Sequence, residues 1–223
     1  EGKTLSDLQT LNSRLLADGL DITAMNIERR KISRIKGGGL LGAFTGQAAQ
    51  VLAISDVPGD DLSVIGSGIG APPEPCPFNC ETRIIASNTI ARNAAVDAAK
   101  ALGLTVLENA ETLHDDLPTL AKQIGPRLRD MPDGVIVLGG EPTVVLPPNP
   151  GRGGRNQALA LELAREIKGI DGLTIIVGGT DGSDGPTDAA GGVVDGRTWS
   201  TGAAETLKAA DSGTFLEQQG ALF

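Results

Sequence analysis

The segment at residues 173–192 constrains the fold more than any other part of the chain. Residues 173–177 are apolar and rich in β-branched side chains, which predicts a short, buried strand of a parallel sheet. A glycine-rich loop follows at residues 178–192. In α/β folds, ligands bind at the carboxyl ends of such strands. The segment therefore predicts an α/β fold with a ligand site at this loop.

Polar side chains in the same loop supply oxygens suited to several kinds of chemistry. They are Thr180, Asp181, Asp184, Thr187 and Asp188. Such oxygens bind Mg²⁺, contact a hydroxyl group or accept a proton. The spacing of the aspartates is not that of an EF-hand calcium loop. The alternative is a polar turn whose aspartates only cap the next helix, and both interpretations remain open here.

The rest of the chain repeats the alternation of strand and helix. Expected strands lie at residues 49–54, 84–86, 104–107, 135–138, 144–146 and 173–177. Expected helices lie at residues 4–19, 23–36, 88–102, 115–130, 155–168, 199–210 and 211–219. The first helix has capping-box spacing at Ser6 and Gln9. This order predicts α/β architecture with a mainly parallel sheet. The proline-rich stretch at residues 69–81 suggests a boundary between two domains, 1–81 and 82–223.

The amino-acid composition of the chain limits the classes of partner that it can bind. The chain has 19 Lys and Arg against 28 Asp and Glu, a net charge of −9, and 2% aromatic residues. Nucleic-acid binding is disfavoured, because it needs a basic face and stacking platforms. No apolar run is long enough to span a membrane, and Glu1-Gly2-Lys3 does not resemble a signal peptide, so we expect a cytoplasmic protein with a small-molecule partner. Cys76, Cys80 and the single His114 are too few for a zinc site.

Two clusters could bind anions. The first consists of Arg29, Arg30, Lys31, Arg34 and Lys36, and is either a solvated helix face or a site for carboxylate or phosphate. Lys36 is the sharper candidate, because three glycines follow it. The second spans the glycine-bearing segments 139–143, 151–157 and 178–188, where phosphates could meet backbone N–H groups at the helix start near Arg155. These segments match neither a Walker A loop nor a G-x-G-x-x-G fingerprint, and Arg152 and Arg155 could also lie in a solvated turn.

Two long motifs make the chain similar to a known family. Gly154-Arg155-Asn156-Gln157 and the run Gly179-Thr180-Asp181-Gly182-x-Asp184-Gly185-Pro186-Thr187-Asp188-Ala189-Ala190-Gly191 resemble the MOFRL domain of the class II glycerate kinases. Some members of that family are named hydroxypyruvate reductases. In the first half, the matching segments are Asp7-Leu8-Gln9, Met25-Asn26, Ile35-Lys36-Gly37-Gly38, Ser55-Asp56-Val57, Gly59-Asp60, Ser67-Gly68 and Ser87-Asn88. The resemblance covers nearly the whole chain.

The resemblance implies a two-domain α/β kinase with a Rossmann-like N-terminal part, incomplete here, and a C-terminal MOFRL-type domain. It implies transfer of the γ-phosphoryl group of ATP to the 2-hydroxyl of D-glycerate, with Mg²⁺ as the metal cofactor. A homodimer is one possible assembly. The expected catalytic residues are Arg155, Asp181, Asp184 and Asp188, with Asp181 and Asp184 as metal ligands. The expected substrate-binding residues are Lys36, Arg29, Ser55, Asp56 and Ser67. The expected nucleotide-binding residues are Gly139, Gly140, Glu141, Gly154, Asn156, Gly179 and Thr180.

The chain also departs from the family pattern. It lacks an upstream segment with a catalytic lysine and a Gly-Gly-Ala-Ser-type loop, and it ends before an expected Gly-Pro-Thr-Gly-Thr-Asn segment. Either parts of a larger protein are omitted here or the chain is a degenerate relative, and we favour omission, because the retained loops keep their chemical character. Two other functions stay open: an NAD(P)-dependent hydroxypyruvate reductase, which would need a dinucleotide fingerprint that is not found, and a non-catalytic ligand-binding relative.

Overall fold

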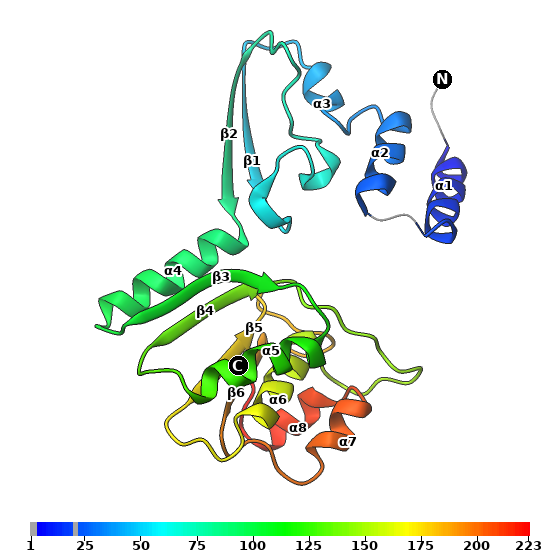
Figure 1. Cartoon of the computed structure of the whole chain (residues 1–223). Coiled ribbons are helices and arrows are strands. Elements are labelled where there is room, and N and C mark those ends of the chain that lie inside the picture. Colours follow the sequence, from blue (N-terminus) through cyan, green and yellow to red (C-terminus); the bar gives the residue numbers. More distant parts are fainter. Residues whose placement is uncertain (1–3, 20–21) are drawn as a thin grey trace. The chain divides into compact units, whose positions relative to one another are not determined.

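The chain folds into two compact units, residues 1–90 and 91–223 (Figure 1). The computed structural model describes residues 4–19 and 22–223; the stretch Glu1–Lys3, on which the argument against a signal peptide rests, lies outside the described residues. Sheet and helix are mixed in both units, which confirms the α/β class. The border expected after residue 81 falls inside a strand of the first unit.

The first unit is built on a pair of parallel strands. Its elements are α1 Leu5–Ala17, α2 Ile22–Ile32, α3 Gly39–Gly42, β1 Ala48–Ile54, the short 3₁₀ turns η1 Pro58–Asp60 and η2 Ile65–Ser67, and β2 Asn79–Ala86. The strands β1 and β2 run in register from Ala48 opposite Asn79 to Ala53 opposite Ile84, and the register shifts at Ile54. The segment 55–78 connects the two strands, as parallel pairing requires.

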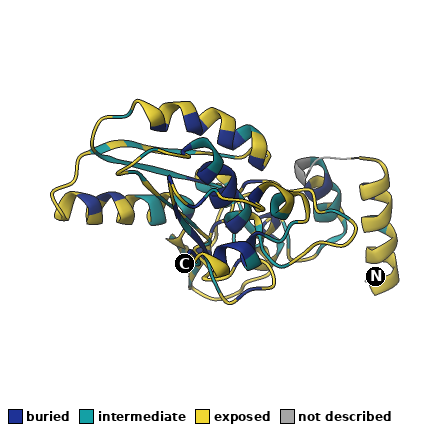
Figure 2. Cartoon of the chain, turned by 90° about the horizontal axis from the view of Figure 1, so that it is seen from below, coloured by how far each residue is buried: buried dark blue, intermediate teal, exposed yellow. Residues whose placement is uncertain are grey.

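The N-cap of helix α1 lies two residues before the expected one. Thr4 is the N-cap residue and forms a capping box with Asp7, so the prediction of Ser6 and Gln9 was wrong. A carboxylate at this position satisfies the N-cap N–H as a glutamate would. Leu15 is the buried residue of α1, and Figure 2 shows this helix exposed along almost all of its length. Ser87 caps the later helix α4 Asn88–Ala101, because its hydroxyl accepts from the N–H of Ile90 at 3.3 Å.

The second unit contains the larger core. Its elements are most of α4 Asn88–Ala101, β3 Val106–Leu113, α5 Leu117–Arg129, β4 Val135–Gly140, α6 Arg155–Glu166, β5 Thr174–Gly178, β6 Gly191–Asp195, α7 Ala203–Lys208 and α8 Ser212–Gln218. The strands β3 and β4 are parallel, whereas β5 and β6 are antiparallel. Every helix among the described residues is too short or too polar to cross a lipid bilayer.

The strand β5 differs from the buried parallel strand predicted at residues 173–177. It pairs antiparallel with β6, and its residues alternate between exposed and half-buried, with Ile176 61% exposed. Residues 191 and 192 were expected in the glycine-rich loop, but they are the first two residues of β6 Gly191–Asp195. A Cβ atom on Gly191 would lie 1.8 Å from the carbonyl oxygen of Val177, so glycine permits this close pairing of the two strands.

Residues 144–146 do not form the predicted return strand. They have no regular structure, and Val145 is 95% exposed. Pro147 and Pro148 follow directly. Proline lacks a backbone donor and restricts the residue before it, which disfavours a hydrogen-bonded strand here.

The helix α6 lies between two buried clusters and fixes the centre of the second unit. Leu159, Leu163 and Ile167 pack with α5, while Ala160, Leu161 and Ala164 pack with residues of β6, α7 and α8. Each fully buried leucine contributes about 1.5–3 kcal/mol. The helix α6 is therefore held in place from both sides.

Candidate active-site loop and its relatives

The loop after β5 closes onto the start of α6. Gly154, the N-cap residue of α6, has no side chain with which to cap it. Instead, Oδ1 of Asp184 accepts from the N–H of Asn156 at 3.1 Å, and Oδ2 accepts from the N–H of Gln157 at 2.7 Å. A carboxylate at a helix N-terminus satisfies N–H groups that would otherwise lack partners. Two of the N–H groups that we expected to meet a phosphate are therefore already engaged.

Asp184 is a buried residue, with 4% of its surface exposed. Burial raises the pKa of its carboxyl group, while the two backbone N–H donors and the charge of Arg155 act in the opposite direction. Because both oxygens accept hydrogen bonds from α6, Asp184 is a poor candidate for an open Mg²⁺ ligand. The predicted assignment of Asp184 to the metal does not fit this geometry.

Two glycines permit the contact between the loop and the helix. A Cβ atom on Gly154 would lie 2.2 Å from Oδ1 of Asp184. Gly185 has φ +61°, and a Cβ atom there would lie 2.4 Å from the carbonyl oxygen of Gly153. A larger residue at either position would push the carboxylate away from the helix.

Two buried side chains complete the contact. Gln157 is fully buried, and its Nε2 donates to Oγ1 of Thr187 at 2.7 Å. The hydroxyl of Thr187 lies 2.8 Å from the carbonyl oxygen of Asp184, to which it can donate. Gln157 was missed, and Thr187 was named among the polar residues of the loop but not among the expected site residues, although both stand in the family-like motifs. The available signal was the polar Gln157 at the start of an otherwise apolar helix face.

Arg155 and Glu141 meet at the surface beside this loop. Nη1 of Arg155 lies 3.0 Å from Oε1 of Glu141, and the side chains are 44% and 57% exposed. Glu141 directly follows Gly139 and Gly140, the last residues of β4. The structure thus brings a predicted catalytic residue next to a predicted nucleotide-binding segment.

The other predicted residues of the loop lie close to Asn156, are exposed, or both. A Cβ atom on Gly179 would lie 2.8 Å from Oδ1 of Asp181 and 3.1 Å from Nδ2 of Asn156, so these three predicted residues lie together. Thr180, Asp181 and Asp188 are exposed. The N–H of Ser183 donates to Oδ1 of Asp181 at 3.3 Å. Across the described residues, no three His, Cys, Asp or Glu side chains are arranged to hold a metal ion.

Arg152 has a separate role from Arg155. Its guanidinium pairs with Glu217 of α8, and its backbone N–H donates to Oδ1 of Asp211 at 2.8 Å. Glu217 is the main cause that raises the pKa of Arg152, and Asp188 contributes a smaller electrostatic part. Arg152 therefore connects its loop to α8.

In the first unit, Lys36 and Ser67 belong to one chain of hydrogen bonds. Nζ of Lys36 donates to Oγ of Ser67 at 3.3 Å, and that hydroxyl donates to Oδ1 of the buried Asn26 at 2.9 Å. Ser67 has φ +61°. The site prediction missed Asn26, which lies on the buried side of α2.

The other predicted substrate residues are engaged elsewhere or lie apart. Nε and Nη2 of Arg29 donate to Oδ1 of Asn12 at 3.1 and 2.7 Å. The buried Ser55 makes a local turn, with its Oγ 3.3 Å from both the N and the O of Val57. Asp56 is exposed. Lys36 and Ser67 are the two of these five residues that the structure joins by a hydrogen bond.

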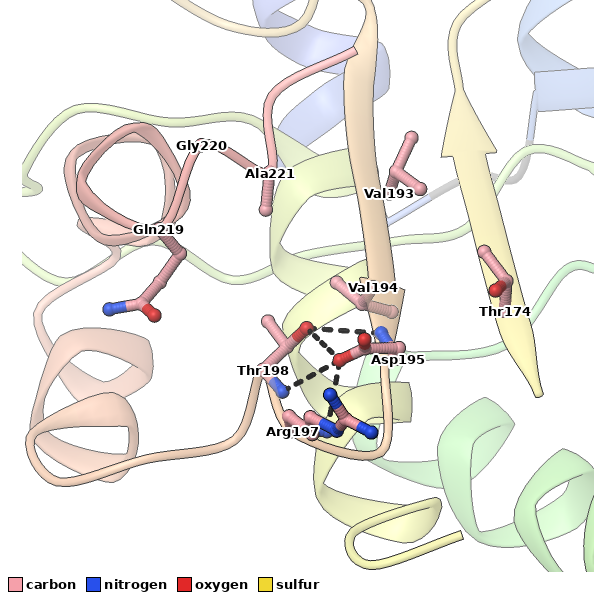
Figure 3. A pocket seen from close by; sticks show the side chains of 9 residues that line it. All are labelled: Thr174, Val193, Val194, Asp195, Arg197, Thr198, Gln219, Gly220 and Ala221. Atoms are coloured by element: carbon pink, nitrogen blue, oxygen red, sulfur yellow. Dashed lines mark hydrogen bonds between the residues drawn. The ribbon is translucent and has the colours of Figure 1, made fainter. Parts of the chain in front are cut away.

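A shallow pocket of about 440 Å³ lies at the other end of the β5–β6 pair (Figure 3). It is lined in part by Thr174, the first residue of β5, and by Asp195, the last of β6. Oδ1 of Asp195 accepts from the N–H groups of Arg197 and Thr198 at 2.9 and 3.1 Å, which lowers its pKa. The pocket contains none of the predicted site residues, so we place the candidate site at the loop instead.

The fold and the loop correspond to two known sequence families. Residues 134–223 match the MOFRL family, and residues 1–103 match a domain of unknown function, DUF4147. The chain is therefore an α/β protein that combines these two domains.

The relatives with this combination include glycerate kinases. A D-glycerate 2-kinase of Thermotoga maritima is 35% identical over the whole chain, which covers 64% of that relative. A glycerate kinase of Macaca fascicularis is 30% identical over 96% of the chain, which covers 74% of that relative. The crystal structure of a Thermotoga maritima glycerate kinase superimposes with a TM-score of 0.87 at 31% identity, over 100% of this chain and 64% of that one. The chain belongs to the glycerate kinase family.

The chain corresponds to only part of the length of these relatives. The chain spans less than two thirds of the length of the Thermotoga relative, 64%, and the alignment extends over 266 positions, more than the 223 residues present here. Some other relatives carry the name hydroxypyruvate reductase.

Proposed function

We propose that this protein is a glycerate kinase that transfers the γ-phosphoryl group of ATP to the 2-hydroxyl of D-glycerate and gives 2-phosphoglycerate. The observation that carries the proposal is the start of α6. There, Asp184 caps the helix, and Arg155 extends from the first turn toward Glu141 and the end of β4. The names of the relatives support glycerate as the acceptor.

Phosphoryl transfer asks mainly for positioning and for compensation of charge. Arg155 would bind the transferring phosphoryl group, because its planar fork matches two phosphate oxygens. The backbone of residues 139–141 and of Gly154, together with Asn156, Gly179 and Thr180, would line the nucleotide. Lys36, held by Ser67, would bind the glycerate carboxylate.

Mg²⁺ would neutralise phosphate charge when bound. It commonly uses one or two carboxylates and takes its other ligands from phosphate and water. Asp181 fits such a role, because it is exposed and stands beside Asn156 and Gly179. Asp188 is the second exposed carboxylate of the loop and remains our candidate for the base that accepts the hydroxyl proton. We assign Asp184 to holding the loop.

Three assays test the proposal. The protein is incubated with D-glycerate and Mg-ATP, with hydroxypyruvate and NADH, and with each ligand alone. We expect ADP formation in the first assay, and ³¹P NMR of the product should show phosphate on the 2-oxygen. NADH turnover with hydroxypyruvate would favour the reductase, and binding without turnover would favour a non-catalytic relative.

A further inference from the structure

The hydroxyl of Thr187 contacts two other residues of the candidate site. It accepts from Nε2 of Gln157 on α6 at 2.7 Å, and it lies 2.8 Å from the carbonyl oxygen of Asp184, the residue whose carboxylate caps that helix. All three residues are buried. The loop is thus tied to α6 by backbone N–H groups through Asp184 and by side chains through Thr187 and Gln157.

Gln157 occupies this position at a cost. Its Oε1 is buried and lacks a hydrogen-bond partner. A Cβ atom on Gly213 would lie 2.7 Å from that oxygen, and one on Gly153 3.3 Å, so the amide fits into a narrow slot. A buried polar atom without a partner destabilises the fold. An apolar side chain of similar length would avoid that loss, so the contribution of the amide lies in its bond to Thr187.

Arg155 stands two residues before Gln157, in the same first turn of α6. Its guanidinium is exposed and reaches Glu141. A small change in the direction of this turn moves the end of the long arginine side chain much further than it moves the backbone. Misplacement of a catalytic group by about 1 Å can reduce the rate about 100-fold.

We propose that Thr187 and Gln157 are positioning residues for Arg155, and that the hydrogen bond between their side chains sets the reach of its guanidinium. The inference rests on the proposed function. It adds that the loop orients the guanidinium of Arg155 and also supplies polar groups of its own.

The test uses a matched pair of variants at one position. Thr187→Val keeps the shape of the side chain but removes the hydroxyl, and Thr187→Ser keeps the hydroxyl. We expect Thr187→Val to lower kcat about 10- to 100-fold with little change in the KM for glycerate, and Thr187→Ser to stay within about threefold of the unchanged protein. Circular dichroism and Tm report folding. Gln157→Met, which removes the donor and also the unpaired oxygen, should reproduce the loss if Thr187→Val does not fold.

A second background separates positioning from a general structural effect. In a protein that already carries Arg155→Ala, Thr187→Val should lower kcat less than about threefold, because the group that it positions is gone. Equal losses in both backgrounds, or normal kcat in folded Thr187→Val and Gln157→Met, would overturn the inference alone. Near-normal kcat in Arg155→Ala itself would overturn the proposed role of Arg155 together with the inference.

Discussion

Asp184 shows that the aspartates of one loop have different roles at the residue scale. It is buried against the N–H groups of α6, whereas Asp181 and Asp188 are exposed. The spacing of the three residues in the sequence could not separate them. The alternative interpretation of the loop has its aspartates cap the next helix, but Asp184 accepts from the N–H of Asn156, 28 residues earlier in the chain, and so caps a preceding helix. Such a distant contact leaves no local pattern.

Removal of Asp184 should destabilise the protein. Asp184→Ala leaves two N–H groups of α6 without their acceptor, and we expect a loss of about 1–3 kcal/mol in the free energy of unfolding. Urea denaturation at pH 7 measures it. An unchanged free energy of unfolding would mean that the cap contributes nothing.

The same residue predicts a pH trend. The pKa of Asp184 is raised in the folded state above its unfolded value near 3.8, so the folded state retains this proton at higher pH than the unfolded chain does. The contribution of this group to stability is therefore fully present below pH 3.8 and falls as the pH rises through the folded pKa. Asp184→Asn does not titrate, so its stability relative to the unchanged protein should improve as the pH rises through this window. Urea denaturation at several pH values measures the trend, and a difference that is constant with pH would contradict it.

Arg155 should act on the transition state. Arg155→Ala is expected to lower kcat by about 10³, and Arg155→Lys should also lower it steeply while nucleotide binding changes little, because lysine keeps the charge but loses the bidentate geometry. Arg152→Ala is the control. Its guanidinium forms a surface pair with Glu217, and we expect a loss of less than about tenfold. Steady-state kinetics with Mg-ATP and D-glycerate on the three variants measures these losses. Equal losses of kcat in Arg155→Ala and Arg152→Ala would contradict the assignment.

Lys36 should affect the substrate more than the nucleotide. We expect Lys36→Ala to raise the KM for glycerate about 10- to 100-fold, as for loss of one charge-assisted contact, with a smaller change in the KM for ATP. Arg29→Ala is the matched control in the same basic cluster, because Arg29 is held by Asn12. If both variants leave the KM for glycerate unchanged, the cluster is a solvated face.

At the scale of elements, the sequence predicted what depends on local pattern. The helices α4, α5 and α6 and the strands β1 and β4 lie close to their expected ranges, because apolar periodicity and caps mark them. The strand β6 was missed, since Gly191 and Gly192 resemble the loop that precedes them. The direction of strand pairing could not be predicted from the sequence either. β5 has the composition of a buried parallel strand, but it pairs antiparallel with β6, which follows the loop directly.

Two glycines of the loop provide a matched test at this scale. Gly182 and Gly185 both have positive φ, but a Cβ atom on Gly182 would have no neighbour within 4 Å, while one on Gly185 would contact Gly153. Gly182→Ala should cost about 1–2 kcal/mol from backbone strain alone. Gly185→Ala should cost more, and it alone should also lower kcat. Thermal unfolding and kinetics on both variants measure this, and equal behaviour would show that the contact with residue 153 is unimportant.

At the scale of the whole chain, the family could be recognised from long motifs, whereas the fine structure of the site could not. Arg155, Glu141 and Lys36 were selected by charge and by glycine context, and the structure adds their partners. Gln157, Thr187 and Asn26 act through buried hydrogen bonds, which depend on side chains that are distant in sequence. Sequence position alone does not reveal such partners.

The position of α6 between two buried clusters has a consequence for inactivation by heat. Leu159→Ala and Leu161→Ala empty opposite sides of the same helix, and each should cost about 2–5 kcal/mol. We expect both variants to lose kinase activity at the same temperature at which the second unit unfolds, as measured by calorimetry, and activity that disappears well below that temperature would contradict this. No part of the core on either side of α6 can then melt while Arg155 stays in place. Under the proposed function, catalysis and cooperative unfolding of the second unit should therefore share a single thermal limit, and a stabilising change on either side of α6 should extend the temperature range of the proposed activity.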